Sequence, residues 1–300
     1  MPFAVLPLLL ANAERRAARE QADRVFKQST CGTPWTPECA RGYRVEELNA
    51  TPWARDSPES ERLLRQRHAA ARRECATVVV AGGGGGGWCY SWRAASARPA
   101  PERVVLPHNR SSYDLPWGHT RADEGFVGAL ADIVEATTPP AHRTLNDFGA
   151  GVGQYGRSLQ SRSPSLRWRG WDGAGDVEQF TDGLVGYFDL TIPLALPRAQ
   201  WVMSLEVGEH VPRAFEPVLL RNLHVHACRG VILSWAAPSA KGVGHVNNHG
   251  AEYLADVFVA LGYTRNARFE AQLRRAVRTS PWLRRTMVWE RVHPVAEGEC

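Results

Sequence analysis

The sequence predicts an α/β fold built on a doubly wound, mostly parallel sheet, preceded by a mainly helical or irregular extension. Two observations support this prediction. From about residue 145 onward, short β-type runs alternate with longer amphipathic stretches, which is typical of βα units. The first of these runs ends in alternating glycines, LNDFGAGVGQYG from Leu145 to Gly156, and such a turn joins a strand to a helix in Rossmann-like sheets.

The individual elements follow from the spacing of apolar residues. The expected strands are TLNDFG (144–149), LRWRGWD (166–172), VGYFDL (185–190), AQWVMSLE (199–206), GVILSWA (230–236) and RTMVWERV (285–292). The expected helices are FVGALADIVEAT (126–137), QYGRSLQSR (154–162), RAFEPVLLRNLHVHA (213–227), AEYLADVFVALGY (251–263) and residues 268–278.

Composition divides the chain into four parts. The first holds a short apolar run that fits either a signal-peptide core or the start of an amphipathic helix, and it is too short to span a bilayer. The second is the extension, with helical composition at 14–28 and 59–74, a flexible glycine turn at 82–87 and a polar linker at 93–103. The third is a lid or pre-core segment, and the fourth is the sheet domain. The four parts span residues 1–13, 14–105, 106–142 and 143–293.

Charge and cysteine content narrow the function classes. The net charge is +5, and arginine is concentrated in 14–73 and 265–285. Without zinc-finger spacing, an aromatic RNA-binding signature or heptads, we interpret this as dispersed surface charge and not as a nucleic-acid surface. Four of the six cysteines lie in the first ninety residues without a CxxC pair, which is compatible with two disulfides. Cys228 is interpreted as a buried small hydrophobe. Cytoplasmic and secretory locations both stay open.

The glycine turn predicts a nucleotide-like ligand. Gly149, Gly151 and Gly153 let the backbone approach a ligand at the end of a strand, and the next helix offers free N–H groups. This much fits NAD, FAD or S-adenosylmethionine.

Three acidic residues discriminate between these ligands. Asp172 ends the second strand, where a carboxylate accepts hydrogen bonds from ribose hydroxyls. Asp189 ends the third strand, where it would meet an adenine amino group. Asp147 lies within the turn itself, where it suits an ammonium and a sulfonium and would repel a pyrophosphate. The acids therefore favour S-adenosylmethionine over a dinucleotide.

From about 143 to 292 the chain resembles class I S-adenosylmethionine-dependent methyltransferases. The motifs DFGAGVGQYG, WDGAGDVEQFTDG, WVMSLEVGEHVP, LSWAAP and GHVN are similar, in this order, to a poorly characterised methyltransferase-like family of animals and algae. The resemblance implies that Asp147 and the three glycines form the cofactor turn, with Asp172 on the ribose and Asp189 near the adenine. Phe148 departs from the commonest pattern, which has a smaller or aliphatic residue there.

The segment SLEVGEHVP carries the candidate catalytic residues Glu206, Glu209 and His210. Similar segments occur in methyltransferases that modify hydroxyls of quinone precursors and RNA ends, where these residues hold a divalent ion with a downstream histidine. In this chain that ligand would be His245, with His249 in reserve. Two carboxylates suit magnesium, and two histidines point toward manganese, iron or zinc. Two alternatives stay open. One is a metal-free general base at His210, and in the other Glu206 packs beside the methionine part of the cofactor while His210 caps the next helix.

Residues that face the methyl acceptor are expected in two places. Tyr113, Trp117 and His119 lie just ahead of the core, where this class carries a substrate-side lid, although an ordinary loop fits as well. Trp235 ends the fifth strand and lines either the substrate site or the core. His224 and His226 are interpreted as surface or packing residues, because a spacing of two turns them in different directions.

The sequence thus predicts a methyltransferase whose acceptor is a hydroxyl, with or without a divalent metal such as Mg or Mn. An amine acceptor stays open, and the acceptor is either a small molecule or a polymer. Two other classes also remain: an NAD-dependent oxidoreductase on the same type of sheet, and a non-catalytic methyltransferase fold that acts as a binding module. No transmembrane segment is expected.

Overall fold

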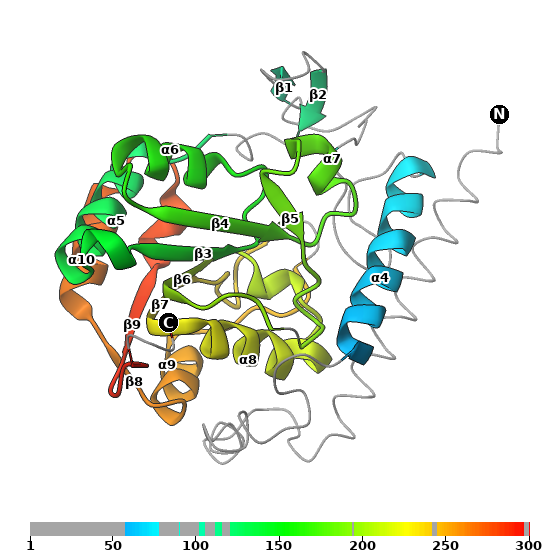
Figure 1. Cartoon of the computed structure of the whole chain (residues 1–300). Helices are drawn as coiled ribbons and strands as arrows, with labels where there is room; N and C mark the ends of the chain where they lie inside the picture. The colour runs from blue at the N-terminus through cyan, green and yellow to red at the C-terminus, as the bar shows by residue number, and fades with distance from the viewer. Residues whose placement is uncertain are drawn as a thin grey trace.

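The computed structural model describes residues 58–77, 90, 102–105, 112–115, 121–193, 195–241, 245–296 and 300. Its core is a seven-stranded sheet with the order β5-β4-β3-β6-β7-β9-β8 (Figure 1). β9 runs antiparallel to both of its neighbours, and the other pairings are parallel. The strands are β3 (Thr144–Phe148), β4 (Arg167–Asp172), β5 (Val185–Tyr187), β6 (Ala199–Leu205), β7 (Ala227–Ser234), β8 (Tyr263–Arg265) and β9 (Met287–Arg291). This topology confirms the predicted Rossmann-like fold of the class I methyltransferase type.

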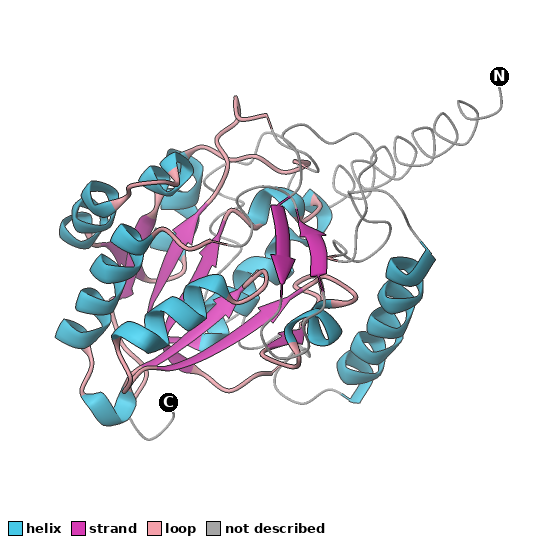
Figure 2. Cartoon of the chain, turned by 90° about the horizontal axis from the view of Figure 1, so that it is seen from above, coloured by secondary structure: helices cyan, strands magenta, loops and turns pink. Residues whose placement is uncertain are grey.

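Helices cover both faces of the sheet (Figure 2). Because successive strand residues point to opposite faces, Met203 of β6 joins one buried cluster and its neighbour Val202 joins the other. The first cluster lies under α5, α6 and α10, and the second lies under α8 and α9. These helices are α5 (Glu124–Thr137), α6 (Gln154–Arg162), α8 (Glu216–His226), α9 (Ala251–Ala260) and α10 (Ala267–Ala276). All five were predicted, with ends displaced by up to three residues.

Several short elements of this domain were not predicted. β8 and α7 (Val177–Thr181) span three and five residues, too few for a hydrophobic period to stand out. The turn η3 (Arg213–Phe215) precedes α8, so the α-helix begins only at Glu216. Three further 3-10 turns are η1 (Pro140–His142), η2 (Gly208–His210) and η4 (Pro281–Arg285).

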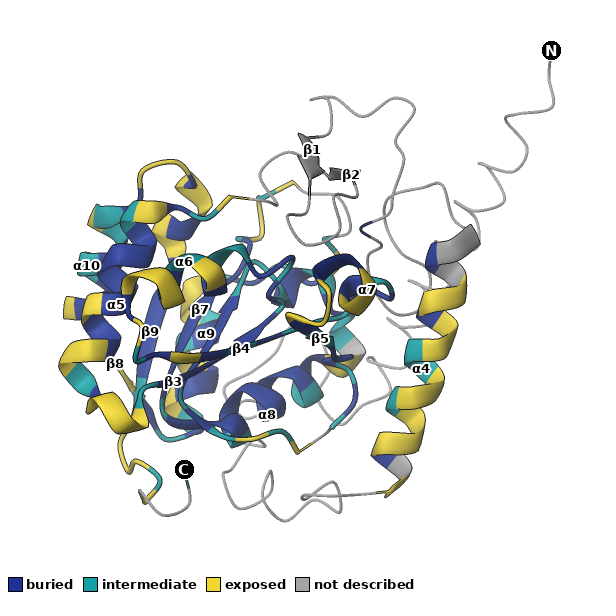
Figure 3. Cartoon of the chain, turned by 45° about the horizontal axis from the view of Figure 1, so that its top comes forward, coloured by how far each residue is buried: buried dark blue, intermediate teal, exposed yellow. Residues whose placement is uncertain are grey.

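The described part of the extension lies beside the sheet domain. The helix predicted at 59–74 is α4 (Pro58–Thr77), which is largely exposed in Figure 3, whereas the strands are buried. β1 (Glu102–Val105) and β2 (Ser112–Leu115) pair as an antiparallel hairpin. The linker predicted over 93–103 is therefore wrong at its last two residues, because cross-strand pairing to β2 outweighs their local polar composition. The predictions for 1–13, 14–28 and 82–87 fall outside the described residues.

Cys228 is buried, as predicted, but the prediction of a lone cysteine is wrong, because this residue forms a disulfide with Cys300. The two are 72 residues apart in sequence, and the chain after β9 returns to β7, where the Val295 N–H donates to the Cys228 carbonyl at 3.0 Å. Cys75 is also disulfide-bonded. None of the helices in the described ranges is both long enough and apolar enough to cross a bilayer.

Candidate functional site

The strand order fixes where a ligand should bind. The chain runs outward from β3 through β4 to β5, then returns to the other side of β3 for β6 and β7. In open α/β sheets, ligands bind outside the carboxyl ends of the strands at such a reversal. The glycine turn follows β3, and the SLEVGEHVP segment follows β6, so both lie at this reversal.

The turn after β3 is as tight as its glycines predicted. Gly149, Gly151 and Gly153 all have positive φ, at 83°, 60° and 76°. A Cβ atom on Gly149 would stand 2.2 Å from the Val207 side chain, so the turn packs directly against the segment after β6. Because side chains at these positions would be strained or would clash, the turn requires glycine.

Asp147 is buried and Asp172 is half-buried, and they lie at the ends of neighbouring strands. The carboxylate of Asp172 accepts hydrogen bonds from the backbone N–H groups of Gly151 and Ala174, both at 2.9 Å. Burial nevertheless raises its pKa to about 6. Asp147 is 3% exposed, and the Trp168 indole donates to it at 3.2 Å. Burial, with a smaller contribution from the charge of Asp172, raises the pKa of Asp147 to about 7.

Asp189 follows β5, as predicted, but its local contacts differ from those of the other two acids. Its Oδ1 accepts from the Thr191 backbone N–H at 2.9 Å and from the Thr191 hydroxyl at 2.6 Å. The carboxylate thus closes a turn of its own chain. Its role toward an adenine stays a prediction.

Glu206 and Glu209 form a carboxyl pair after β6. Glu206 has a φ of 55°, a left-handed conformation that is uncommon for a residue with a side chain and is found at functional sites. Glu209 is fully buried, and neither of its carboxyl oxygens has a hydrogen-bond partner at normal geometry among the described residues. Burial first, and repulsion from Glu206 second, raise the pKa of Glu209 to about 8.

Three of the four predicted metal ligands lie together. The group consists of Glu209, His210 and His245. Each residue offers one ligand atom, and these three atoms lie within 4.8 Å of one another, which is close enough for all three to bind the same ion. The two histidine rings are 5.0 Å apart between centroids. The backbone after His245 is fixed to the same place, since the N–H groups of Val246 and Asn247 both donate to the Glu209 carbonyl. Glu206 is not in this group of three.

A buried network that sequence reasoning missed holds the His245 loop. Glu216 is fully buried and accepts from Asn247 at 2.7 Å, from His249 at 2.6 Å and from the Tyr253 hydroxyl. His249 is therefore hydrogen-bonded to Glu216 and is not part of the group formed by Glu209, His210 and His245. The sequence around Glu216, at the start of α8, does not indicate that this residue accepts hydrogen bonds from the His245 loop. The three donors follow Glu216 by 31 or more residues.

The remaining candidates are placed as follows. Trp235 is 2% exposed, and its indole donates to the Asn247 carbonyl at 2.6 Å, which favours the core alternative. Tyr113 belongs to β2, and Trp117 and His119 fall outside the described residues. His224 and His226 are each 1% exposed, so they are packing residues and the surface alternative is wrong.

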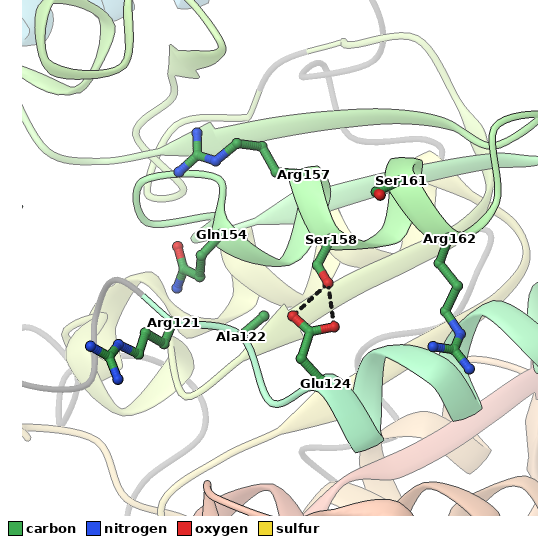
Figure 4. A pocket seen from close by; sticks show the side chains of 8 residues that line it. All are labelled: Arg121, Ala122, Glu124, Gln154, Arg157, Ser158, Ser161 and Arg162. Atoms are coloured by element: carbon green, nitrogen blue, oxygen red, sulfur yellow. Dashed lines mark hydrogen bonds between the residues drawn. The ribbon is translucent and has the colours of Figure 1, made fainter. Parts of the chain in front are cut away.

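A separate hollow lies between α5 and α6 (Figure 4). It has a volume of about 760 Å³, and within it the Ser158 hydroxyl lies 2.8 Å from both carboxylate oxygens of Glu124. None of the candidate cofactor, catalytic or metal-binding residues lines it. The lining residues are Arg121, Ala122, Glu124, Gln154, Arg157, Ser158, Ser161 and Arg162.

No protein-family model matches the sequence, and no curated protein matches it either. Among solved structures, the chain is similar to magnesium protoporphyrin IX methyltransferase (ChlM) from Synechocystis PCC 6803 with bound SAM, at 17% identity and a TM-score of 0.41 over 56% of this chain and 79% of that one. It is also similar to SAM-bound CalS10, an amino pentose methyltransferase from Micromonospora echinaspora, at 14% identity and a TM-score of 0.46, over 58% of this chain and 94% of that one.

A third similar structure is an O-methyltransferase family protein from Burkholderia thailandensis, at 15% identity and a TM-score of 0.38 over 57% of each chain. With TM-scores of 0.46 or lower, these likenesses assign neither fold nor function. The strand order defines the fold class, and any function must be argued from the chain's own residues.

Proposed function

We propose that this protein is an S-adenosylmethionine-dependent methyltransferase. The observation that carries the proposal is the pair of carboxyls, the buried Asp147 and the half-buried Asp172, beside a glycine turn at the reversal of the sheet. Both have raised pKa values because burial leaves their charged forms poorly compensated. A ligand that brings a cation and a ribose diol would compensate both, whereas a pyrophosphate would add a third negative charge.

The chain's own groups would bind and orient this ligand. The Gly151 N–H donates a hydrogen bond to Asp172 and so orients that carboxylate toward the glycine turn. The cofactor supplies an electrophilic methyl group, and transfer breaks its bond to sulfur as a bond to the acceptor forms. The protein's contribution to such an in-line displacement is largely proximity and orientation.

We propose a hydroxyl acceptor, because a weak nucleophile needs help to lose its proton. Glu209, His210 and His245 support this step, since they gather at the end of β6, next to the cofactor turn. If they hold a divalent ion, its role would be to acidify the acceptor hydroxyl. Without an ion, the imidazole of His210 would accept the proton. Glu206 would stand beside the methionine part of the cofactor, and the narrower resemblance to the animal and algal family stays a prediction.

The proposal is tested by calorimetric titration of the full chain with S-adenosylmethionine and, separately, with NAD. We expect the first ligand alone to bind. Asp172→Ala should weaken that binding by about a hundredfold, because two hydrogen bonds to a charged acceptor are lost. Asp132→Ala, at an exposed position on α5, is the matched control and should bind as the wild type does. Binding of NAD alone, or of neither ligand, would overturn the proposal in favour of an oxidoreductase or a non-catalytic module.

A further inference from the structure

Helix α4 of the extension turns one face toward the sheet domain. Leu64, His68, Ala71 and Cys75 recur at helical spacing, so they line a single side of the helix. Ala71 and Cys75 are buried, and Leu64 packs against the hydrophobic cluster under α5 and α6. Figures 1 and 3 show α4 beside the β5 edge of the domain.

This face of α4 meets the ends of β4 and β5. The His68 ring stacks on that of Tyr187, the last residue of β5, with centroids 4.1 Å apart and planes 5° from parallel. A Cβ atom on Gly175 would stand 2.4 Å from the Ala71 backbone. Tyr187 is paired with Asp172 across the two strands, and Gly175 follows Asp172 by three residues. The face therefore lies where the ribose and the adenine of the proposed cofactor would bind.

The two stacked rings carry buried polar atoms that lack partners. Tyr187 is 6% exposed, yet its hydroxyl has no hydrogen-bond partner among the described residues. The Nε2 atom of His68 is also buried and has no such partner there, since the Glu178 carboxylate is 3.8 Å away, too far for a hydrogen bond. Glu178 instead accepts from the Tyr187 backbone N–H at 3.0 Å. Because a buried polar atom without a partner costs free energy, two such atoms in one place indicate a ligand that hydrogen-bonds to them.

Adenine matches these two side chains. It is a flat ring whose nitrogens accept hydrogen bonds and whose amino group donates them. Burial raises the pKa of Tyr187 and lowers the pKa of His68, so at neutral pH the hydroxyl keeps its proton and the imidazole is uncharged. In that state each side chain can donate or accept a hydrogen bond.

The position in the sheet also favours adenine over the methyl acceptor. Asp189, which is predicted to face the adenine amino group, follows Tyr187 by two residues. The candidate catalytic residues follow β6, which β4 and β3 separate from β5.

We infer that His68 and Tyr187 bind the adenine ring of the cofactor, so that α4 completes a site otherwise built by the sheet domain. This inference rests on the proposed function and adds two binding residues to it, one of them from the extension. Neither polar atom has a partner among the described residues of the free protein, and each gains a hydrogen bond when adenine binds.

The first test measures the binding of S-adenosylmethionine and of adenosine by full-length wild type, Tyr187→Phe, His68→Phe and Tyr263→Phe. We expect Tyr187→Phe and His68→Phe each to bind both ligands about tenfold more weakly, because each loses a hydrogen bond to adenine but keeps a ring at its position. Tyr263→Phe is the matched control. It removes a buried tyrosine hydroxyl that is bonded to His224 near the far edge of the sheet, and it should bind both ligands as the wild type does.

Urea denaturation of the free protein separates a binding role from a structural one. Tyr187→Phe should leave the midpoint unchanged or raise it, because the hydroxyl gives up no hydrogen bond when the ligand is absent. Tyr263→Phe should lower the midpoint, since it loses the bond to His224. A lowered midpoint for Tyr187→Phe would show that its hydroxyl already has a partner, and it would overturn the inference.

Equal adenosine binding by wild type, Tyr187→Phe and His68→Phe would overturn the inference as well. The proposed function would still stand in that case, provided that S-adenosylmethionine binds. If the wild type binds neither ligand, the proposed function fails, and the adenine site fails with it.

Discussion

Replacing Asp147 by asparagine should stabilise the free protein and at the same time weaken its binding of S-adenosylmethionine. The carboxyl of Asp147 is buried with the Trp168 indole as its one donor among the described residues, and its pKa is raised to about 7. Ionising it in the folded state therefore costs free energy that ionisation in the unfolded chain does not. An asparagine keeps the shape and an acceptor oxygen for Trp168 without the charge.

The sign of the pH dependence follows from the raised pKa. Because the folded-state pKa lies above the unfolded one, the wild type loses stability as the pH rises from about 4 to about 7. The gain from Asp147→Asn should be about 4 kcal/mol at neutral pH and should fall below about 1 kcal/mol near pH 4, where the folded state and about half of the unfolded chains keep the proton. Urea denaturation at the two pH values measures it.

The exposed substitution Asp132→Asn is the control and should change stability at neither pH. The loss of ligand binding by Asp147→Asn should be about a hundredfold, since the ligand's cation loses its buried counter-charge. Equal stability of wild type and Asp147→Asn at neutral pH would show that the carboxylate is already compensated in the free protein. Asp147 would then have no need of a cationic ligand.

Glu209→Gln should have the second large effect, which is a loss of Mn²⁺ binding and of methyl transfer. Glu209 is fully buried, has no hydrogen-bond partner at normal geometry among the described residues, and lies with His210 and His245 within reach of one ion. A neutral amide keeps the shape but is a far weaker ligand for a hard cation. We expect Mn²⁺ affinity at about pH 8 to fall at least tenfold, as measured by electron paramagnetic resonance of the free ion.

The control is Glu252→Gln, an exposed carboxylate on α9, which should bind Mn²⁺ as the wild type does. If neither wild type nor Glu209→Gln binds the ion and methyl transfer needs none, the metal proposal fails and the general-base alternative at His210 stands. If the ion binds equally well to both, Glu209 is not a ligand.

The central part of the fold was predictable because its signals are local. α6 was predicted with its observed bounds, since a run of glycines fixes its start. The ends of β3 and β4 follow from strand-like runs that stop at a glycine turn and at Asp172. The positions of Asp147, Asp172 and Glu209 at one edge then follow from the rule that parallel strands end together.

What could not be predicted depends on contacts between distant residues. Three features each join segments far apart in sequence: the disulfide between Cys228 and Cys300, the network around Glu216, and the hydrogen bond from the Tyr90 N–H to Asp176. No periodicity or motif predicts a contact between such distant segments, because the contact depends on how the helices pack on the sheet. The fully buried Glu216 gave no hint of its partners for this reason.

The most direct test of the central claim is the proton balance of S-adenosylmethionine binding. Calorimetric titration near pH 6.5, in two buffers with different ionisation enthalpies, counts the protons exchanged. Since the pKa values of Asp147 and Asp172 are about 7 and about 6 in the free protein, and a bound cation and diol would lower both, binding should release on the order of one proton. Binding without proton release, or with proton uptake, would contradict the claim that the carboxyls of Asp147 and Asp172 receive the cofactor.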